Sequence, residues 1–133
     1  MIPVAEGIMT RMARSVSPET SVEACAIEMA RDGIGSLLVE RDGDYIGIIT
    51  EVDILRKVVA KRREPSTVSA EEIMAAPLIT VEADQSLVDV NALMEKERIR
   101  HLGVCRYGKV VGMISVRDLL HPLIIEEDVP LIH

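Results

Sequence analysis

The sequence contains no Phe or Trp and two Tyr, so 2% of its residues are aromatic although 48% are hydrophobic. A core built without large rings must be assembled from Val, Ile, Leu, Met and Ala. The scarcity of aromatic rings also removes the side chains on which single-stranded bases stack. Because the formal net charge is −7, general binding to nucleic acid or to an anionic membrane surface is disfavoured.

Cysteine and long apolar runs are scarce as well. Cys25 and Cys105 stand alone in apolar surroundings, without a CxxC pair, so we interpret them as small buried hydrophobic residues in a reducing cytoplasm. The three histidines share no metal-ligand spacing with them, and no metal site is expected. No apolar run reaches membrane-spanning length, and residues 1–7 are too short and mixed for a signal peptide. A cytoplasmic location is therefore expected.

The main feature of the chain is an internal repeat. When the sequence is aligned with itself at an offset of 65, residues 8–56 match residues 73–121 without a gap, and 14 of the 49 aligned pairs are identical. Repetition at this level indicates two copies of one supersecondary unit. We expect a first repeat with the N-terminal segment at 1–64 and a second repeat with the C-terminal tail at 65–133, together forming one compact module.

Each copy predicts the element order β-α-β-β-α. Ser21 and Ser86 are expected N-caps of helices whose apolar residues recur at helical spacing. Asp42-Gly43 and Tyr107-Gly108 predict tight hairpin turns. One such unit leaves an apolar sheet face uncovered. The sequence therefore predicts an α/β (α+β) fold in which two units pack sheet to sheet about a pseudo-twofold axis.

The segments that flank the second copy are less regular. Residues 57–63 form a basic stretch beyond the helix that starts near Thr50, and we interpret it as a solvated face compatible with the helix dipole. Residues 69–74 predict a short helix. Pro122 is expected to end the last helix early, and the tail, 123–133, is expected to pack on the module or on a second copy.

A hydroxyl and a carboxylate recur together in the stretches 47–53 and 112–118. Each stretch predicts a strand that is followed directly by a helix. Thr50 or Ser115 occupies the N-cap, and Asp53 or Asp118 lies in the first turn, where the helix dipole favours a carboxylate. The simplest interpretation is a capping box without any ligand. Its occurrence twice, within a longer repeat, makes a functional role worth considering.

These two stretches, preceded in each copy by Ile-Met and by Ser-(Val/Leu) at matching spacing, resemble the cystathionine-beta-synthase (CBS) domain over about residues 5–121. Two in tandem resemble a CBS pair, or Bateman module. The resemblance implies a regulatory module that requires no cofactor and binds AMP, ADP, ATP or S-adenosylmethionine in clefts between the repeats. It also implies a disc-like homodimer, and a separate effector protein would have to sense the bound state.

Carried onto this chain, the resemblance implies two clefts in which Asp accepts hydrogen bonds from ribose hydroxyls and Arg binds phosphate. The first cleft would comprise Ile34, Gly35, Ser36, Thr50 and Asp53, with Pro77, Leu78 and Ile79 from the other repeat. The second would comprise Arg100, His101, Ser115 and Asp118, with Met12 and Ala13 opposite.

The two clefts are expected to differ in charge. The second repeat has Arg98, Arg100 and His101 where the first has Gly33, Gly35 and Ser36. The second cleft should therefore bind a charged nucleotide more tightly. For His101 the alternative is a histidine packed at a strand start, and Arg11 and Arg14 either contact phosphate or face water.

Two other functions compete with ligand sensing. An enzyme that uses either hydroxyl–Asp pair is disfavoured, because no general base adjoins the hydroxyls and His101 precedes Ser115 by a whole hairpin. A structural dimerisation module with vestigial clefts is the main alternative. Stabilisation by a ligand would separate this alternative from a sensor.

Overall fold

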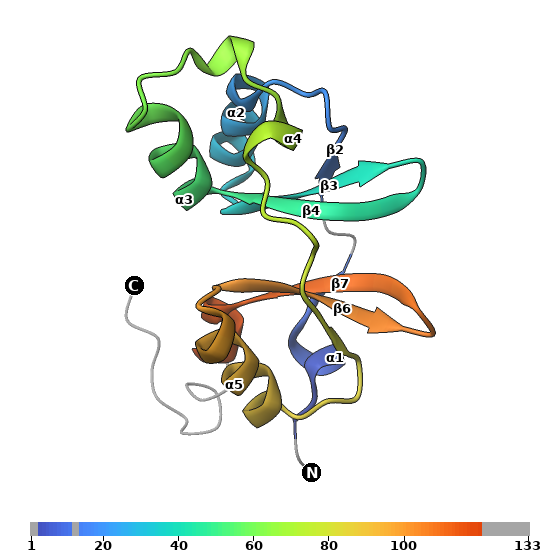
Figure 1. Ribbon diagram of the computed structural model, residues 1–133. Coiled ribbons are helices and arrows are strands. Elements are labelled where there is room, and N and C mark those ends of the chain that lie inside the picture. Colours follow the sequence, from blue (N-terminus) through green and yellow to red (C-terminus); the bar gives the residue numbers. More distant parts are fainter. Residues whose placement is uncertain (1–2, 12–13, 121–133) are drawn as a thin grey trace. The chain divides into compact units, whose positions relative to one another are not determined.

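The computed structural model describes residues 3–11 and 14–120. The chain divides into two compact units, shown in Figure 1. The repeat-1 unit comprises Ala13–Leu78, and the repeat-2 unit comprises Ile79–His133 together with Met1–Met12. The unit boundaries differ from the 64/65 division of the sequence repeat, because the N-terminal segment packs with the second copy.

The repeat-1 unit contains a three-stranded sheet in the order β2-β3-β4, in which β2 is parallel and β4 antiparallel to β3. In Figure 1, α2 and α3 lie on the same side of the β3–β4 hairpin. The elements in chain order are β2 (Ser15–Val16), α2 (Val22–Asp32), β3 (Ser36–Arg41), β4 (Asp44–Thr50), α3 (Glu51–Ile54), the π-helical turn η1 (Leu55–Val59), the 3-10 turn η2 (Pro65–Thr67) and α4 (Ala70–Ile73).

The repeat-2 unit contains a four-stranded sheet in the order β1-β7-β6-β5. Strand β1 is antiparallel to β7, β6 is antiparallel to β7, and β5 is parallel to β6. Its elements are α1 (Ala5–Ile8), β1 (Thr10–Arg11), β5 (Thr80–Glu82), α5 (Leu87–Glu97), β6 (His101–Arg106) and β7 (Lys109–Ser115), after which residues 116–120 are helical. The predicted effects of Pro122 and the tail lie outside the described residues.

The local predictions from the sequence are confirmed. The hydroxyl of Ser21 accepts a hydrogen bond from Ala24 N at 3.0 Å, which caps α2, and Ser86 caps α5 in the same way. Gly33 ends α2 in the left-handed conformation, with φ of 65°. Both hairpin turns have positive φ at their two central residues, the geometry that matches the twist of paired strands. The short helix predicted at 69–74 is α4.

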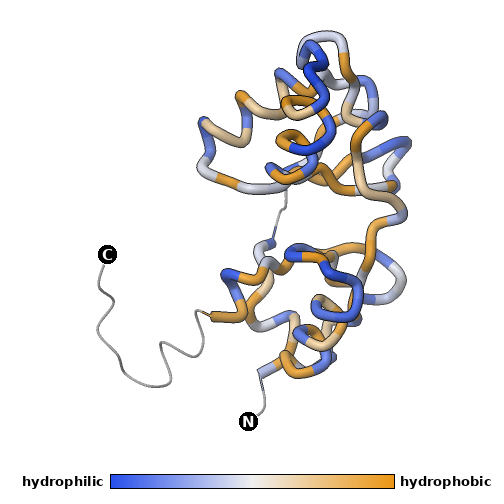
Figure 2. Tube along the Cα trace, turned by 60° about the vertical axis from the view of Figure 1, so that its left-hand side comes forward, coloured by the Kyte–Doolittle hydropathy of each residue, from blue (hydrophilic) through white to orange (hydrophobic). Residues whose placement is uncertain are grey.

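Each unit has its own aliphatic core, and every side chain of the two core clusters is Val, Ile, Leu, Met, Ala or Cys. Figure 2 shows hydrophobic segments alternating with hydrophilic ones along the chain of each unit. Among the described residues, no polar side chain is fully buried. The fully buried core side chains of the repeat-1 unit include Val22, Cys25, Leu37, Val39, Ile49 and Val58, and those of the repeat-2 unit include Val90, Leu102, Val104 and Ile114.

A glycine in the hairpin of each unit allows an Ile-Met segment to cross the strand closely. A Cβ atom on Gly47 would lie 2.7 Å from the carbonyl oxygen of Ala75 and 2.8 Å from the sulfur of Met74. Ile48 and Ala75 exchange backbone hydrogen bonds of 3.0 and 2.8 Å at this point. Since the backbone itself lies in the way, no side chain fits at position 47 without displacing the segment.

The repeat-2 unit has the same crossing, but the segment comes from the first copy. A Cβ atom on Gly112 would lie 2.6 Å from the sulfur of Met9 and 2.8 Å from the carbonyl oxygen of Thr10. Strand β1 pairs with β7 here, with Arg11 opposite Gly112. The two copies therefore exchange their Ile-Met segments, each of which packs on the hairpin of the other copy.

We predict that Gly47→Ala and Gly112→Ala each destabilise the protein by about 1–3 kcal/mol, the usual cost of overpacking. Urea unfolding measures the loss. Gly7→Ala is the matched control, because a Cβ there has no atom within 4 Å. Gly47 and Gly112 variants as stable as the Gly7 variant would contradict the close crossing.

A second prediction concerns thiol reactivity. Burial, reinforced by the charge of Glu28, raises the pKa of the Cys25 thiol to about 11, whereas Cys105 is only partly buried. Because the thiolate is the reactive form, iodoacetamide at pH 8 should label Cys105 in the folded protein and Cys25 only after unfolding. Mass spectrometry of the peptides distinguishes the two sites, and equal labelling rates without denaturant would contradict the prediction.

Candidate functional site

The first hydroxyl–carboxylate pair lies where β4 ends and α3 begins. Thr50 donates to Asp53 Oδ2 from its backbone N at 3.0 Å and from its Oγ1 at 3.1 Å. Asp53 N lies 3.3 Å from Thr50 Oγ1, to which it donates in return. This reciprocal pattern is a capping box, so the simplest interpretation of the motif is correct as local structure.

The second pair, at the end of β7, repeats the two hydrogen bonds that the carboxylate accepts. Ser115 donates to Asp118 Oδ2 from its backbone N at 2.8 Å and from its Oγ at 3.2 Å. Both Asp side chains are part-buried at a strand end. The strand and the first helical turn thus fix the position of a hydroxyl and a carboxylate in each unit.

A lysine makes the first pair different from the second. Lys57 Nζ lies 3.0 Å from Asp53 Oδ1 and donates to the carbonyl oxygen of Ile73 at 2.9 Å. Both oxygens of Asp53 are therefore engaged, and its side chain is 14% exposed. Lys57 is 46% exposed, as expected for a solvated basic stretch, and its ammonium in addition contacts Asp53.

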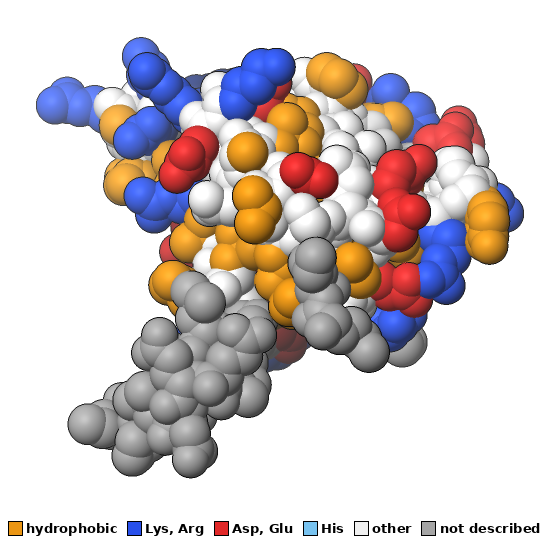
Figure 3. Space-filling view, turned by 90° about the horizontal axis from the view of Figure 1, so that it is seen from below, with side chains coloured by type: hydrophobic (Ala, Val, Ile, Leu, Met, Phe, Trp, Pro, Cys, Tyr) orange, Lys and Arg blue, Asp and Glu red, His pale blue; other side chains and the backbone are white. Residues whose placement is uncertain are grey.

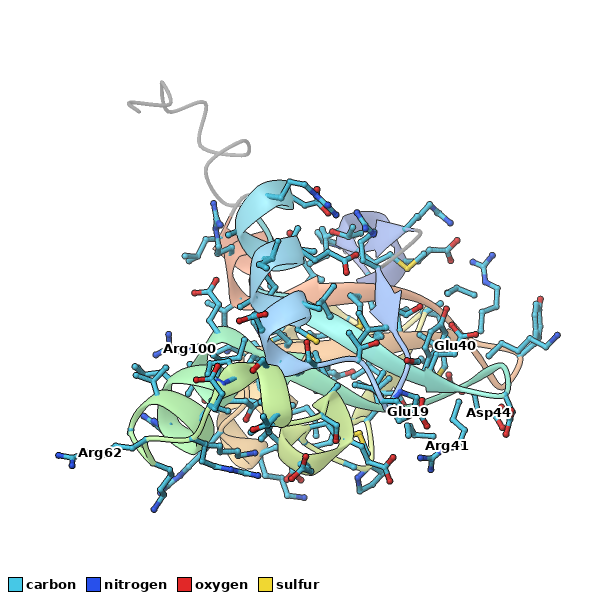
Figure 4. All side chains as sticks on the ribbon, turned by 90° about the horizontal axis from the view of Figure 1, so that it is seen from above. Glu19, Glu40, Arg41, Asp44, Arg62 and Arg100 are labelled. Carbon is cyan, nitrogen blue, oxygen red and sulfur yellow. The ribbon has the colours of Figure 1, made fainter. Side chains whose placement is uncertain are left out.

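The second copy has no counterpart of this ion pair at the equivalent position. Pro122 stands 65 residues after Lys57 and has no charged group. The residue at this aligned position therefore offers Asp118 no ammonium. Beyond η1 the basic stretch is solvated as expected, and Figure 4 shows Arg62 pointing away from the ribbon.

The hairpins bring further predicted residues to the same strand ends. In the repeat-1 unit, Ser36 is the register partner of Thr50, and Gly35 precedes it. In the repeat-2 unit, His101 is the register partner of Ser115, and Arg100 precedes it. The structure thus gathers Gly35, Ser36, Thr50 and Asp53 in one unit, and Arg100, His101, Ser115 and Asp118 in the other.

Ile34 lies beside this group and lines a cavity of about 460 Å³ between α2 and α3. The cavity wall is mainly apolar, with one carboxylate from Glu51. Glu51 is not predictable as a lining residue from the sequence, because nothing in its local pattern distinguishes it from an ordinary first-turn acid. The lining residues are Ala26, Met29, Ala30, Gly33, Ile34, Glu51 and Ile54.

The remaining predicted residues are divided between the units. Pro77 and Leu78 belong to the repeat-1 unit, and Ile79 belongs to the repeat-2 unit, where its carbonyl oxygen accepts a hydrogen bond from Gly103 N at 2.9 Å. Met12 and Ala13 lie outside the described residues.

The two basic residues considered near the second cleft have carboxylate partners in their own units. Arg14 forms ion pairs with Glu28 and Asp32. Arg11 lies 3.5 Å from Glu6, and 64% of its side chain is exposed. Of the two alternatives, phosphate contact or solvent, the structure shows exposed side chains, and Arg14 is 49% exposed while its guanidinium is also engaged by two acids.

Arg98 ends α5 in the left-handed conformation, with φ of 55°. Gly33 ends α2 at the equivalent position with φ of 65°. A left-handed backbone costs a residue with a Cβ about 1–2 kcal/mol, and glycine avoids this cost. The second repeat therefore places a basic side chain at a cap where glycine fits better.

We predict that Arg98→Gly stabilises the protein by about 1 kcal/mol through relief of this conformation, and that Gly33→Arg destabilises it by a similar amount. Thermal unfolding of both variants against the wild type provides the measurement. A loss of stability in Arg98→Gly would show that contacts of the Arg98 side chain outweigh the backbone cost.

The described residues offer neither a metal site nor a membrane-spanning helix. Residues 3–11 and 14–120 contain no group of three or more His, Cys, Asp or Glu side chains that could bind a metal ion. In the same part of the chain, no helix is long and apolar enough to cross a membrane.

Comparison with known proteins identifies the family. The sequence profile of the CBS domain matches residues 4–60 and 70–125, so the chain belongs to the CBS domain family and contains two such domains. An uncharacterized protein of Methanopyrus kandleri is 40% identical over 104 residues, which cover 77% of this chain and 53% of the relative. This chain thus spans about half the length of that relative.

Solved structures agree on the fold. A protein with CBS domains from Burkholderia ambifaria is 38% identical, covers 92% of this chain and 90% of its own length, and superposes with a TM-score of 0.86. A hexameric CBS-CP12 protein from bloom-forming cyanobacteria is 30% identical, with a TM-score of 0.86 over 99% of this chain and 74% of that one. The chain is therefore an α+β CBS domain pair, a class of module that is generally regulatory.

Proposed function

We propose that this CBS pair is a cytoplasmic regulatory module that binds an adenosine-containing ligand, AMP, ADP, ATP or S-adenosylmethionine, and catalyses no reaction. The observation that carries the proposal is the pair of hydroxyl–carboxylate groups fixed at equivalent strand ends. A carboxylate has about four acceptor sites, and the capping box engages Oδ2 in each. Oδ1 of Asp118 can therefore serve the vicinal hydroxyls of a ribose.

The proposal requires the two units to pack sheet to sheet, with the clefts between them. Leu37, Val39 and Ile49 belong to the core of the repeat-1 unit. Because successive side chains of a strand point to opposite faces, Leu38 and Ile48 project from the other face of the same sheet. An apolar second face needs a cover, which supports packing against the other sheet. Pro77 to Ile79 and Met12–Ala13 would then complete the clefts.

The second cleft is proposed to bind the charged nucleotide more tightly. Arg100 can donate paired hydrogen bonds to a phosphate, whereas Gly35 at the equivalent position offers no side chain. Asp118 has no ammonium at the position of Lys57, whereas Asp53 would have to exchange its ion pair for ribose hydroxyls. Both differences favour the cleft of Ser115 and Asp118.

Self-association is a further part of the proposal. Large hydrophobic side chains are exposed on α2, α3 and η1, including Ile27 at 59%, Leu55 at 59% and Val59 at 58%. Figure 3 shows hydrophobic side chains between charged ones on the face drawn there. The cyanobacterial relative assembles as a hexamer. A homodimer would cover such side chains and could pass the bound state to a separate effector protein.

A structural dimerisation module is the second candidate, and one observation favours it for the first cleft. The ion pair of Asp53 with Lys57 leaves that carboxylate satisfied without any ligand. A cleft whose carboxylate is already paired within the protein can be vestigial. Ligand binding by the whole chain separates the two candidates.

We predict a concentration-dependent rise in the unfolding temperature with at least one of AMP, ADP, ATP and S-adenosylmethionine, because a ligand at 100 times its Kd adds about 2.7 kcal/mol to stability. Calorimetry then gives the affinities.

Asp118→Asn and Arg100→Ala should weaken binding of a phosphorylated ligand about tenfold or more, since charged hydrogen bonds contribute about 1.5–3 kcal/mol each.

Asp53→Asn is the matched control, because it removes the same cap in the other repeat. It should cost at least as much stability, since it also removes the charge that pairs with Lys57, and it should leave the main affinity nearly unchanged. Absence of a shift with all four ligands would favour the structural module, and an unaltered affinity in Arg100→Ala would exclude the proposed phosphate contact.

A further inference from the structure

Glu51 occupies a specific place in the first repeat. Its Oε1 lies 2.7 Å from the position that a Cβ atom on Gly35 would take, and its backbone N donates to the carbonyl oxygen of Gly35 at 3.2 Å. The carboxylate therefore lies directly over Gly35, next to the strand end that carries Thr50. It also borders the cavity between α2 and α3.

In the second repeat, the pair of positions equivalent to Gly35 and Glu51 carries a positive charge instead of a negative one. Arg100 replaces Gly35 and Val116 replaces Glu51, while the backbone contact is retained, since Val116 N donates to the carbonyl oxygen of Arg100 at 2.9 Å. Two positions that are joined by the same hydrogen bond thus carry a carboxylate in one repeat and a guanidinium in the other. The backbone hydrogen bond is shared, whereas the side chains differ in size and in the sign of their charge.

We infer that Glu51 makes the cleft of the first repeat reject phosphorylated ligands, so that the chain binds one phosphorylated nucleotide at Asp118 and none at Asp53. This inference rests on the proposed function. Like charges at close range repel, and a repulsive group is an effective way to exclude one class of ligand from a site that otherwise accepts it. The first cleft can then take only an adenosine compound without phosphate, or stay empty.

The difference between the repeats suggests a double variant that gives the first repeat the side chains of the second. Gly35 does not have a positive φ, and the nearest atoms to its missing Cβ belong to the flexible end of Glu51. In the double variant Gly35→Arg, Glu51→Val, the second substitution removes the Glu51 side chain that would obstruct the new arginine. The variant thereby copies the arrangement of Arg100 and Val116. Lys57 is retained in this variant, so the new site should be weaker than the natural one.

The test is calorimetric titration of the full chain with ATP. The wild type should bind one ATP per chain. The double variant should bind a second, with at least a tenfold gain in affinity at the first cleft, and Asp53→Ala in that background should remove only the second ATP. Glu19→Arg, which makes the same change in net charge in the turn before α2, is the control and should still bind one.

The outcomes separate this inference from the function on which it rests. One ATP per chain in both the wild type and the folded double variant would overturn the role of Glu51 and leave the proposed function intact. Two equivalent ATP sites in the wild type would do the same. If neither protein binds ATP, ADP or AMP, the inference fails, and the proposed function fails with it when S-adenosylmethionine does not bind either. Urea unfolding verifies that each variant is folded.

Discussion

The rest of this structure depends on the close crossing of an Ile-Met segment over a hairpin glycine. At Gly47 and Gly112 the crossing backbone or sulfur lies under 3 Å from where a Cβ would be, so the hairpin and the segment fit only if the strand has no side chain there. Because each copy supplies the segment that covers the hairpin of the other, neither copy completes its own unit. A chain cut at the repeat boundary would leave the first hairpin without Met74 and Ala75.

The crossing also determines the position of the hydroxyl–carboxylate pair. A hairpin fixed by its covering segment ends its last strand at a defined place, and there the capping box of Thr50 and Asp53 starts the next helix. Lys57 then joins the two features, since its ammonium contacts both Asp53 and the carbonyl oxygen of Ile73 in the crossing segment. The candidate site of the first repeat is therefore part of the same network that stabilises its fold.

The sequence predicts what depends on near neighbours in the chain. Caps at Ser21 and Ser86, the left-handed stop at Gly33 and the two hairpin turns follow from local rules, and the offset of 65 reveals the repeat. The exchange of Ile-Met segments is not predictable in this way, because a repeat has the same pattern whichever copy it packs on. The bond of Lys57 to Ile73 and the contact of Glu51 with Gly35 also escape prediction, since each depends on an atom brought close by folding.

Comparison of the two repeats separates structural from functional residues. The positions that are identical in both, such as Gly47 with Gly112 and Asp53 with Asp118, have a structural reason on their own, a crossing or a cap. Among the positions around them that differ, Gly35 with Arg100 and Glu51 with Val116 keep the backbone hydrogen bond that joins each pair and change the side-chain charge. A difference that costs the fold nothing is where selection for a ligand can act. The motif therefore identifies the fold, and the proposed difference in ligand preference rests on its unequal neighbours.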